Sequence, residues 1–227
     1  MFRATPIGSI QAAMIERLQI GLGKMVKSVE SYGGELDDEL ATVVRRFPAA
    51  WVSFLGVQAT KGMNTARTKN LARGRFTVMV GQRSVRSEDA PRKGSRDQVG
   101  TDQLIYAVRR LLAGQDFGLD DVGQMKPGAV RPLFNGRAKA DACAIFAVEF
   151  DVEWVEHVLS NGRWPSPDPG QIGDPDATDP DLIFSDEGGK TDEPYPWLTG
   201  IQLDYRLATR SDTDPPNATD VVTFNED

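Results

Sequence analysis

The stretch that decides the fold is ACAIFAVEFDVEW, residues 142–154. From Phe146 onward, large apolar side chains occupy every second position, and the acidic residues Glu149, Asp151 and Glu153 stand between them. Because successive side chains of a strand point to opposite faces of a sheet, this alternation predicts a strand with one buried face. The first half of the stretch is apolar at nearly every position, so we expect it to be covered on both faces.

Three other segments have the periodicity of helices: residues 9–22, 35–46 and 101–113. In each, apolar residues recur every three or four positions and would line one face of a helix. These apolar positions are Ile10, Met14, Leu18 and Leu22, then Leu40, Val43, Val44 and Phe47, and finally Leu104, Ile105, Val108, Leu111 and Leu112. We expect Thr101 to cap the third helix and Gly114 to end it.

Shorter extended segments complete the pattern, at residues 25–32, 49–55, 73–81, 130–134, 199–208 and 220–224. Together they predict an α+β fold, in which about three helices pack on a mostly antiparallel sheet. We divide the 227 residues into a core domain over 1–160, an acidic loop or linker rich in Pro and Asp over 161–197, and closing strands over 198–227 that return to the core sheet.

Charge is distributed unevenly along the chain, whose formal net charge is -7. Residues 1–140 hold 22 basic and 13 acidic residues, whereas residues 141–227 hold 4 and 20. A chain with this polarity can present opposite fields on different surfaces, which suits head-to-tail contacts between identical subunits. The alternative is an ordinary fold that carries an acidic, solvated extension.

The basic charge is concentrated between residues 61 and 96, a segment that contains ten basic residues and only two acidic ones, Glu88 and Asp89. The flanks of the predicted strand, residues 58–72 and 84–100, are polar and rich in turn formers, which predicts mobile loops. We expect this region to bind an acidic partner surface, through Arg67, Lys69, Arg73, Arg75, Arg83, Arg86, Arg92, Lys93 and Arg96. Sequence-specific binding of nucleic acid is disfavoured, because the region lacks a recognition-helix pattern and aromatic residues for stacking.

Residue types that carry chemistry are scarce. The single histidine, His157, has no nucleophile motif around it, and we interpret it as an isolated surface residue. The single cysteine, Cys143, falls in the covered half of a strand and is expected to behave as a small hydrophobe. One Cys and one His cannot supply a structural zinc site, and no phosphate-binding glycine loop is present. We therefore expect no catalytic residue, metal or cofactor.

One acidic segment, DPDATDPD over residues 174–181, invites comparison with a calcium loop. Its prolines interrupt the alternation of ligands, and a bidentate glutamate at the required spacing is missing. We favour a solvated acidic loop. The chain also has no apolar run long enough to span a membrane and no signal-peptide pattern at its start. A single cysteine is compatible with a reducing cytoplasm.

Several segments, taken in order, resemble a known family. They are the helix over residues 9–22, VESYGGELDD at 29–38, FPAAWVSF at 47–54, TDQLIYAV at 101–108, VRPLFN at 130–135 and the strand around 144–150. This succession resembles the Mu-like bacteriophage tail protein family, which comprises the Mu J gene product and its prophage relatives. The similarity covers roughly residues 10–155, fades through the acidic loop and partly returns at 204–224.

The resemblance implies a structural virion protein with a tail-terminator-like fold. Such a subunit would form a ring, by analogy a hexamer, at the head-proximal end of the tail. The implied partners are further copies of the chain, the tail tube or sheath protein and a neck protein, with packaged DNA passing through the ring. The implied location is the virion tail near the neck, after assembly in the host bacterial cytoplasm. The family brings no catalytic residues.

Two rival functions remain open at this stage. A head–tail connector or head-completion protein of the neck would use a similar architecture. A DNA-binding module or an enzyme acting on packaged DNA belongs to a different class. Assembly into rings would favour the terminator over a lone enzyme.

Overall fold

The computed structural model describes residues 5–34, 45–84, 100–138, 141–174, 178–192, 200–205 and 218–223. The chain divides into two compact units, Met1–Arg163 and Trp164–Asp227. Each unit is described by itself.

The first unit contains a five-stranded mixed sheet with the strand order β1-β2-β3-β5-β4. β1 pairs with β2 in parallel, and every other pair in this sheet is antiparallel. The bounds are β1 (Ser28–Ser31), β2 (Ala49–Gly62), β3 (Lys69–Ser84), β4 (Lys126–Ala138) and β5 (Asp141–His157). The expected α+β class, with a mostly antiparallel sheet, is confirmed.

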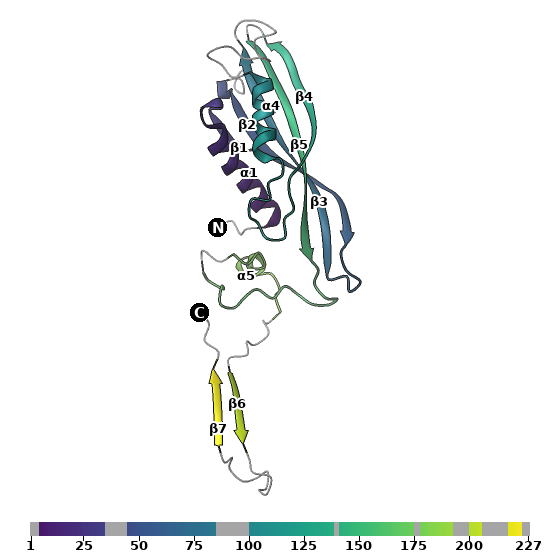
Figure 1. Cartoon of the computed structure of the whole chain (residues 1–227), viewed down its shortest axis with the longest axis vertical. Helices are drawn as coiled ribbons and strands as arrows, with labels where there is room; N and C mark the ends of the chain where they lie inside the picture. The colour runs from purple at the N-terminus through teal and green to yellow at the C-terminus, as the bar shows by residue number, and fades with distance from the viewer. Residues whose placement is uncertain are drawn as a thin grey trace. The chain divides into compact units, whose positions relative to one another are not determined.

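Two helices of this unit, α1 (Pro6–Leu22) and α4 (Thr101–Leu112), lie along the same face of the sheet (Figure 1). The side-chain oxygen of Thr5 accepts from the Gly8 amide at 3.3 Å and caps α1, and the short 3-10 turn η1 (Gly23–Met25) follows the helix. These helices confirm the predictions for residues 9–22 and 101–113. Residues 35–44 of the second predicted helix, 35–46, lie outside the described part of the chain.

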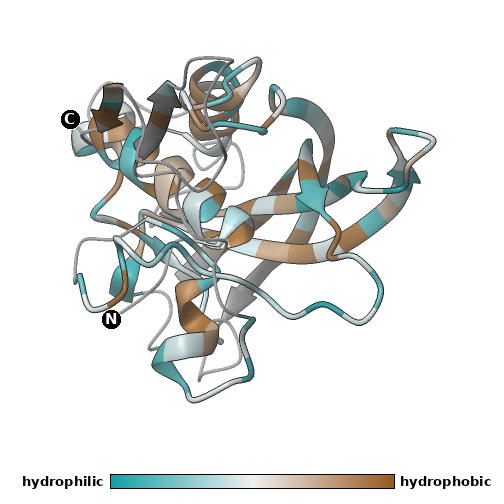
Figure 2. Cartoon of the chain, turned by 90° about the horizontal axis from the view of Figure 1, so that it is seen from below, coloured by the Kyte–Doolittle hydropathy of each residue, from teal (hydrophilic) through white to brown (hydrophobic). Residues whose placement is uncertain are grey.

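The main core forms where these helices meet the sheet. From α1 it receives the predicted stripe Ile10, Met14, Leu18 and Leu22, all at most 1% exposed. From β5 it receives the alternating apolar residues of the opening stretch, including Val148, Phe150, Val152 and Trp154. Figure 2 shows the alternation as brown and teal bands along the strands. The period of two therefore assigned the buried face of β5 correctly.

A second, smaller apolar cluster lies on the opposite face of the same sheet. It consists of Phe47, Ala49, Trp51, Met79, Cys143 and Ile145. Cys143 is 2% exposed, as expected for a covered strand. The early positions of β2 and β5 are thus covered on both faces, as their continuous apolar runs predicted.

Two local predictions were wrong. Thr101 is the first residue of α4 and is fully buried, while Gly100 is the N-cap, with its amide donating to Gln103 Oε1 at 2.9 Å. Residues 58–62 and 69–72 were predicted as a loop but belong to β2 and β3. Residues 70–72 pair with β2 on one side and, together with Lys69, with β5 on the other, so strand pairing satisfies their backbone hydrogen bonds despite the polar sequence.

The second unit contains α5 (Leu182–Asp186), β6 (Gly200–Tyr205) and β7 (Ala218–Thr223). β6 and β7 pair antiparallel with each other in a two-stranded sheet of their own. This differs from the expectation that they close the core sheet. The expected loop over 161–197 includes α5, and its Leu182 side chain is fully buried. The Asp168 amide donates to the carboxylate of Asp179 at 2.9 Å, so part of the acidic segment is internally hydrogen-bonded.

Candidate interaction surface

The face of the sheet that is turned away from α1 and α4 carries a row of paired charges. Glu149, Asp151 and Glu153 project from β5 on this face, because their apolar neighbours point into the core. The register places Arg73 of β3 opposite Glu153, and Arg75 opposite Asp151. Directly opposite residues in an antiparallel pair have adjacent side chains, so opposite charges here can form ion pairs.

The Arg75 pair is the best-formed of these. Its Nε lies 2.7 Å from Asp151 Oδ1, and its Nη2 donates to Oδ2 at 3.1 Å, which gives a bidentate arrangement. The hydrogen bond to Asp151 raises the pKa of Arg75, and the negative charges of Asp151 and Glu149 act in the same direction. Arg75 Nη1 also lies 3.3 Å from Glu149 Oε2.

Glu149 is the buried centre of this network, with a side chain that is 2% exposed. Its second carboxylate oxygen accepts a hydrogen bond from Arg131 of β4, whose side chain is 63% exposed. A buried carboxylate requires compensation for its lost hydration, and here two arginines from the neighbouring strands provide it. Glu149 therefore ties β3, β5 and β4 together through charge.

Glu153, further along β5, forms two more exposed ion pairs. Lys126 Nζ lies 3.0 Å from its Oε2, and Arg73 Nη2 lies 2.6 Å from its Oε1. Hydrogen bonds from Lys126 and then Arg73 lower the pKa of Glu153. The Glu153 side chain is 20% exposed and Lys126 is 60% exposed, so solvent weakens these contacts.

The described residues among the nine predicted partner-binding positions fall into two groups. Arg73 and Arg75 are held in ion pairs within the chain, whereas Arg67 and Lys69 lie at the exposed turn between β2 and β3. Arg83 belongs to β3. Arg86, Arg92, Lys93 and Arg96 lie outside the described residues. Their role as a binding surface remains a prediction.

The turn between β2 and β3, which we call the hairpin tip, comprises residues 61–69. Its side chains Lys61, Met63, Arg67 and Lys69 are all exposed, and Met63 is 52% exposed. Across the part of the chain that the structure describes, Lys61, Arg67 and Lys69 enter no ion pair. The hairpin tip is thus a solvated group of three cations around one apolar side chain.

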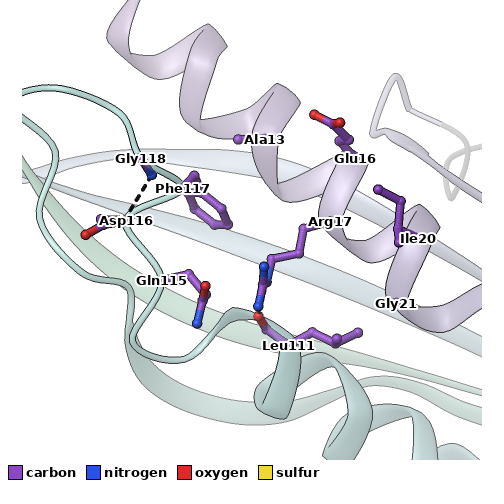
Figure 3. Close-up of a pocket in the computed structure, with 10 residues that line it drawn as sticks. All are labelled: Ala13, Glu16, Arg17, Ile20, Gly21, Leu111, Gln115, Asp116, Phe117 and Gly118. Atoms are coloured by element: carbon purple, nitrogen blue, oxygen red, sulfur yellow. Dashed lines mark hydrogen bonds between the residues drawn. The ribbon is translucent and has the colours of Figure 1, made fainter.

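A groove of about 470 Å³ lies between the C-terminal half of α1 and the loop after α4 (Figure 3). Its apolar lining includes Ile20, Leu111 and Phe117, and its rim carries the carboxylates of Glu16 and Asp116. Arg17 Nε donates to the carbonyl oxygen of Leu111 at 2.6 Å, close to the end of α4. A cation at that position is stabilised by the partial negative charge of the helix C-terminus.

The loop that borders this groove has an unusual backbone. Phe117 and Asp121 adopt φ angles of 61° and 59°, in the left-handed region that non-glycine residues seldom occupy. Asp116 Oδ1 accepts from the Gly118 amide at 3.0 Å and supports the turn. Sequence inspection missed the groove, because its two sides lie about a hundred residues apart and only the exposure of Ile20, 77%, breaks the pattern of α1.

His157, the single histidine, lies at the surface of the first unit. His157 Nε2 lies 3.3 Å from the carboxylate of Asp121, so the histidine has an acidic neighbour rather than being isolated, and both side chains are more than half exposed. Among the described residues, no group of three His, Cys, Asp or Glu side chains is arranged to hold a metal ion. No helix in the described ranges is both long and apolar enough to cross a membrane.

Comparison with protein families gives one result. Residues 6–155 match the family model described as Bacteriophage Mu, Gp37. The match begins at the start of α1 and ends within β5, so it includes α1, α4, β1 to β4 and most of β5. A search of curated proteins found no match. Because the matched residues are well over half of the chain, this protein belongs to the bacteriophage Mu Gp37 family.

Proposed function

We propose that this protein is a structural component of the bacteriophage virion and acts as the tail terminator. In this role it forms a ring, hexameric in our proposal, at the head-proximal end of the tail. The ring caps the tail tube or sheath and offers a docking face to the neck, and packaged DNA passes through it without being read. The observation that carries the proposal is the family match across residues 6–155.

The electrostatics of the chain support assembly with copies of itself. A ring is built from heterologous contacts, in which two different patches of the same subunit meet. The hairpin tip supplies a basic patch, while the chain beyond residue 140 carries 20 acidic and only 4 basic residues. Complementary charges of this kind give a contact its specificity and register more than its affinity.

The proposal includes no catalytic step. The thiol of Cys143 is buried in β5. The side chain of His157 forms a hydrogen bond with the carboxylate of Asp121, and in the described residues no serine, threonine or cysteine side chain is hydrogen-bonded to it. Replacement of His157 by alanine is therefore expected to leave the protein's contribution to infectivity intact.

Electron microscopy of particles made without this protein tests the proposal. A nonsense mutation in its gene should yield filled heads and tails of aberrant form that do not join. Expression of the wild-type chain, or of His157→Ala, in the same cells should restore joined virions.

Other outcomes assign other roles. Heads that lose their DNA would point to a head-completion or connector protein of the neck. Normal joined virions would exclude an essential place in the tail. Failure of His157→Ala to restore infectivity, despite normal particles, would contradict a purely structural role.

A further inference from the structure

The hairpin tip is a rigid feature as well as an exposed one. Asn64 and Thr68 hold it through two hydrogen bonds, from Asn64 Nδ2 to Thr68 Oγ1 at 2.7 Å and from the Thr68 amide to Asn64 Oδ1 at 3.0 Å. The Met63 amide donates to the Lys69 carbonyl at 2.9 Å. The Val158 amide donates to the Thr68 carbonyl at the same distance, so the residue that follows β5 also supports the turn.

This rigidity matters for binding. Ordering a flexible loop on association costs free energy, and a loop that is already held in one conformation avoids most of that cost. The β2–β3 hairpin also extends away from α1 and α4 in the first unit (Figure 1). The hairpin tip therefore presents Met63, with cations on either side, in a position where another molecule can reach it.

The groove beside α1 has the complementary properties. Its lining combines the apolar side chains of Ile20, Leu111 and Phe117 with the carboxylates of Glu16 and Asp116. Arg17 points to the Leu111 carbonyl (Figure 3), so its charge is directed to the end of α4. A methionine side chain is unbranched and adapts to irregular apolar pockets, which fits an open groove of this size.

We propose that the hairpin tip of one copy of this chain docks into the α1–α4 groove of the next copy. Met63 packs on the apolar lining, while Lys61, Arg67 and Lys69 face Glu16 and Asp116. The two patches lie at different places on the same unit, so the contact is head-to-tail and repeats around a closed ring when the rotation permits closure. The inference rests on the proposed ring and names the surface that forms it.

A second copy is a better occupant of this contact than nucleic acid. Phosphate binding needs cations alone, and it gives no role to a half-exposed methionine or to an acid-rimmed apolar groove. The arrangement satisfies both patches of one chain at once, with apolar contact at the centre and charge at the rim, as in most specific protein interfaces.

Cysteine cross-linking tests the contact directly. The only native cysteine, Cys143, is 2% exposed and will not interfere. The double variant Met63→Cys/Ile20→Cys should form disulfide-linked multimers on mild oxidation, in purified protein and in particles from complemented cells. The matched control is Met63→Cys/Tyr106→Cys, because Tyr106 is exposed at 70% on α4 but lies outside the groove. It should give no ladder of multimers.

Sedimentation of charge and core variants gives an independent measurement. Met63→Asp should weaken self-association by about tenfold or more, because it places a carboxylate on an apolar and acidic surface. Glu16→Lys and Lys61→Glu should each weaken it by about two- to fivefold, and their combination should restore part of the loss. Circular dichroism verifies that each variant is folded.

Each contrary result has a definite meaning. Absence of the 63–20 cross-link in both purified protein and particles, or equal laddering of the Tyr106 control, overturns the contact. So does normal assembly of Met63→Asp. Loss of DNA retention with unchanged assembly would assign the hairpin tip to nucleic acid. If the contact fails but the nonsense mutant still makes unjoined tails, only this inference is wrong, since the proposed function is tested by the particles.

Discussion

Two neighbouring parts of the basic stretch, residues 61–69 and 73–75, differ in how the fold uses their charges. In the second part, Arg73 and Arg75 extend across the sheet and form ion pairs with Glu153, Asp151 and Glu149 of β5. In the first part, ten residues or fewer away, Arg67 and Lys69 lie at the exposed hairpin tip, where the described structure gives them no acidic partner. Within the described residues 61–75, the positive charge therefore divides into a structural group and a group that is available to a partner.

A count of charges along the sequence therefore does not by itself locate a binding surface. Strand register decides which cations are neutralised, since each residue of β3 faces a defined residue of β5. Beyond the end of that pairing, the same residue types remain solvated. Mutations in the paired and the solvated group should therefore lower the free energy of unfolding by different amounts, in a definite order.

The largest loss of stability is expected at Glu149, which lies at the centre of the ion pairs on β5. Glu149→Ala removes the buried carboxylate that contacts Arg75 and Arg131. The loss of these charge-assisted contacts should lower the free energy of unfolding by about 2–3 kcal/mol. Urea denaturation measures this change. Glu149→Gln keeps the shape of the side chain and removes its charge, so it should lose most of the stability that Glu149→Ala loses. A much smaller loss in Glu149→Gln would show that packing, not charge, stabilises this position.

A packing change at Gly74 of β3, beside the aromatic rings of Trp154 and Phe54, should rank next. A Cβ added at Gly74 would lie 2.5 Å from the ring of Trp154 and 3.0 Å from that of Phe54. Gly74→Ala should therefore destabilise the fold by about 1–3 kcal/mol through overpacking. Gly62→Ala is the matched control near the hairpin tip, where the nearest atom would be Asn70 Oδ1 at 4.0 Å. Comparable thermal midpoints for the two variants would contradict this view of the packing at Gly74.

The exposed pair at Glu153 should give a small effect that depends on pH. Its folded pKa is lowered by Lys126 and Arg73, so its stabilising contribution is present above the unfolded pKa of about 4.3 and is lost as pH falls through the folded value. Glu153→Gln should thus be slightly less stable than wild type at pH 7. The gap should close on acidification below about pH 4. A gap that stays constant across this range would assign the effect to packing.

Sequence reasoning recovered the parts of the fold that depend on local pattern. The stripe from Ile10 to Leu22 and the alternation from Phe146 to Trp154 both assigned the buried face, because helix and strand periods are properties of neighbouring residues. It failed at residues 58–62 and 69–72. Their polar side chains favoured a loop, but residues 59–62 pair with β3 and residues 69–72 pair with β5, and this pairing supplies the hydrogen bonds of a strand.

The candidate surface was predictable only in part, for the same physical reason. The basic stretch was visible, but its division required the register that sets Arg75 opposite Asp151. The burial of Glu149 depends on Arg131 and Arg75, which come from two other strands. The groove joins Ile20 to Phe117 through the packing of α1 on α4, and a long-range contact of this kind leaves no spacing signal in the sequence.

The smallest effect on stability is expected at the hairpin tip, and it provides the sharpest form of the comparison. Lys61→Glu/Lys69→Glu changes the charge by as much as Arg73→Glu/Arg75→Glu does, within the same hairpin. Lys61 and Lys69 are exposed and carry no ion pair in the described structure, so their reversal should change the free energy of unfolding by about 0.5 kcal/mol or less. The second variant places acidic side chains opposite Glu153 and Asp151, so like charges meet across adjacent strands and the midpoint of urea unfolding should fall clearly.

Urea denaturation of both variants at low and high salt measures the difference between their midpoints, which should narrow as salt screens the repulsion. Equal midpoints for the two variants would mean that register does not divide the basic stretch, and the distinction between its two groups would have to be abandoned.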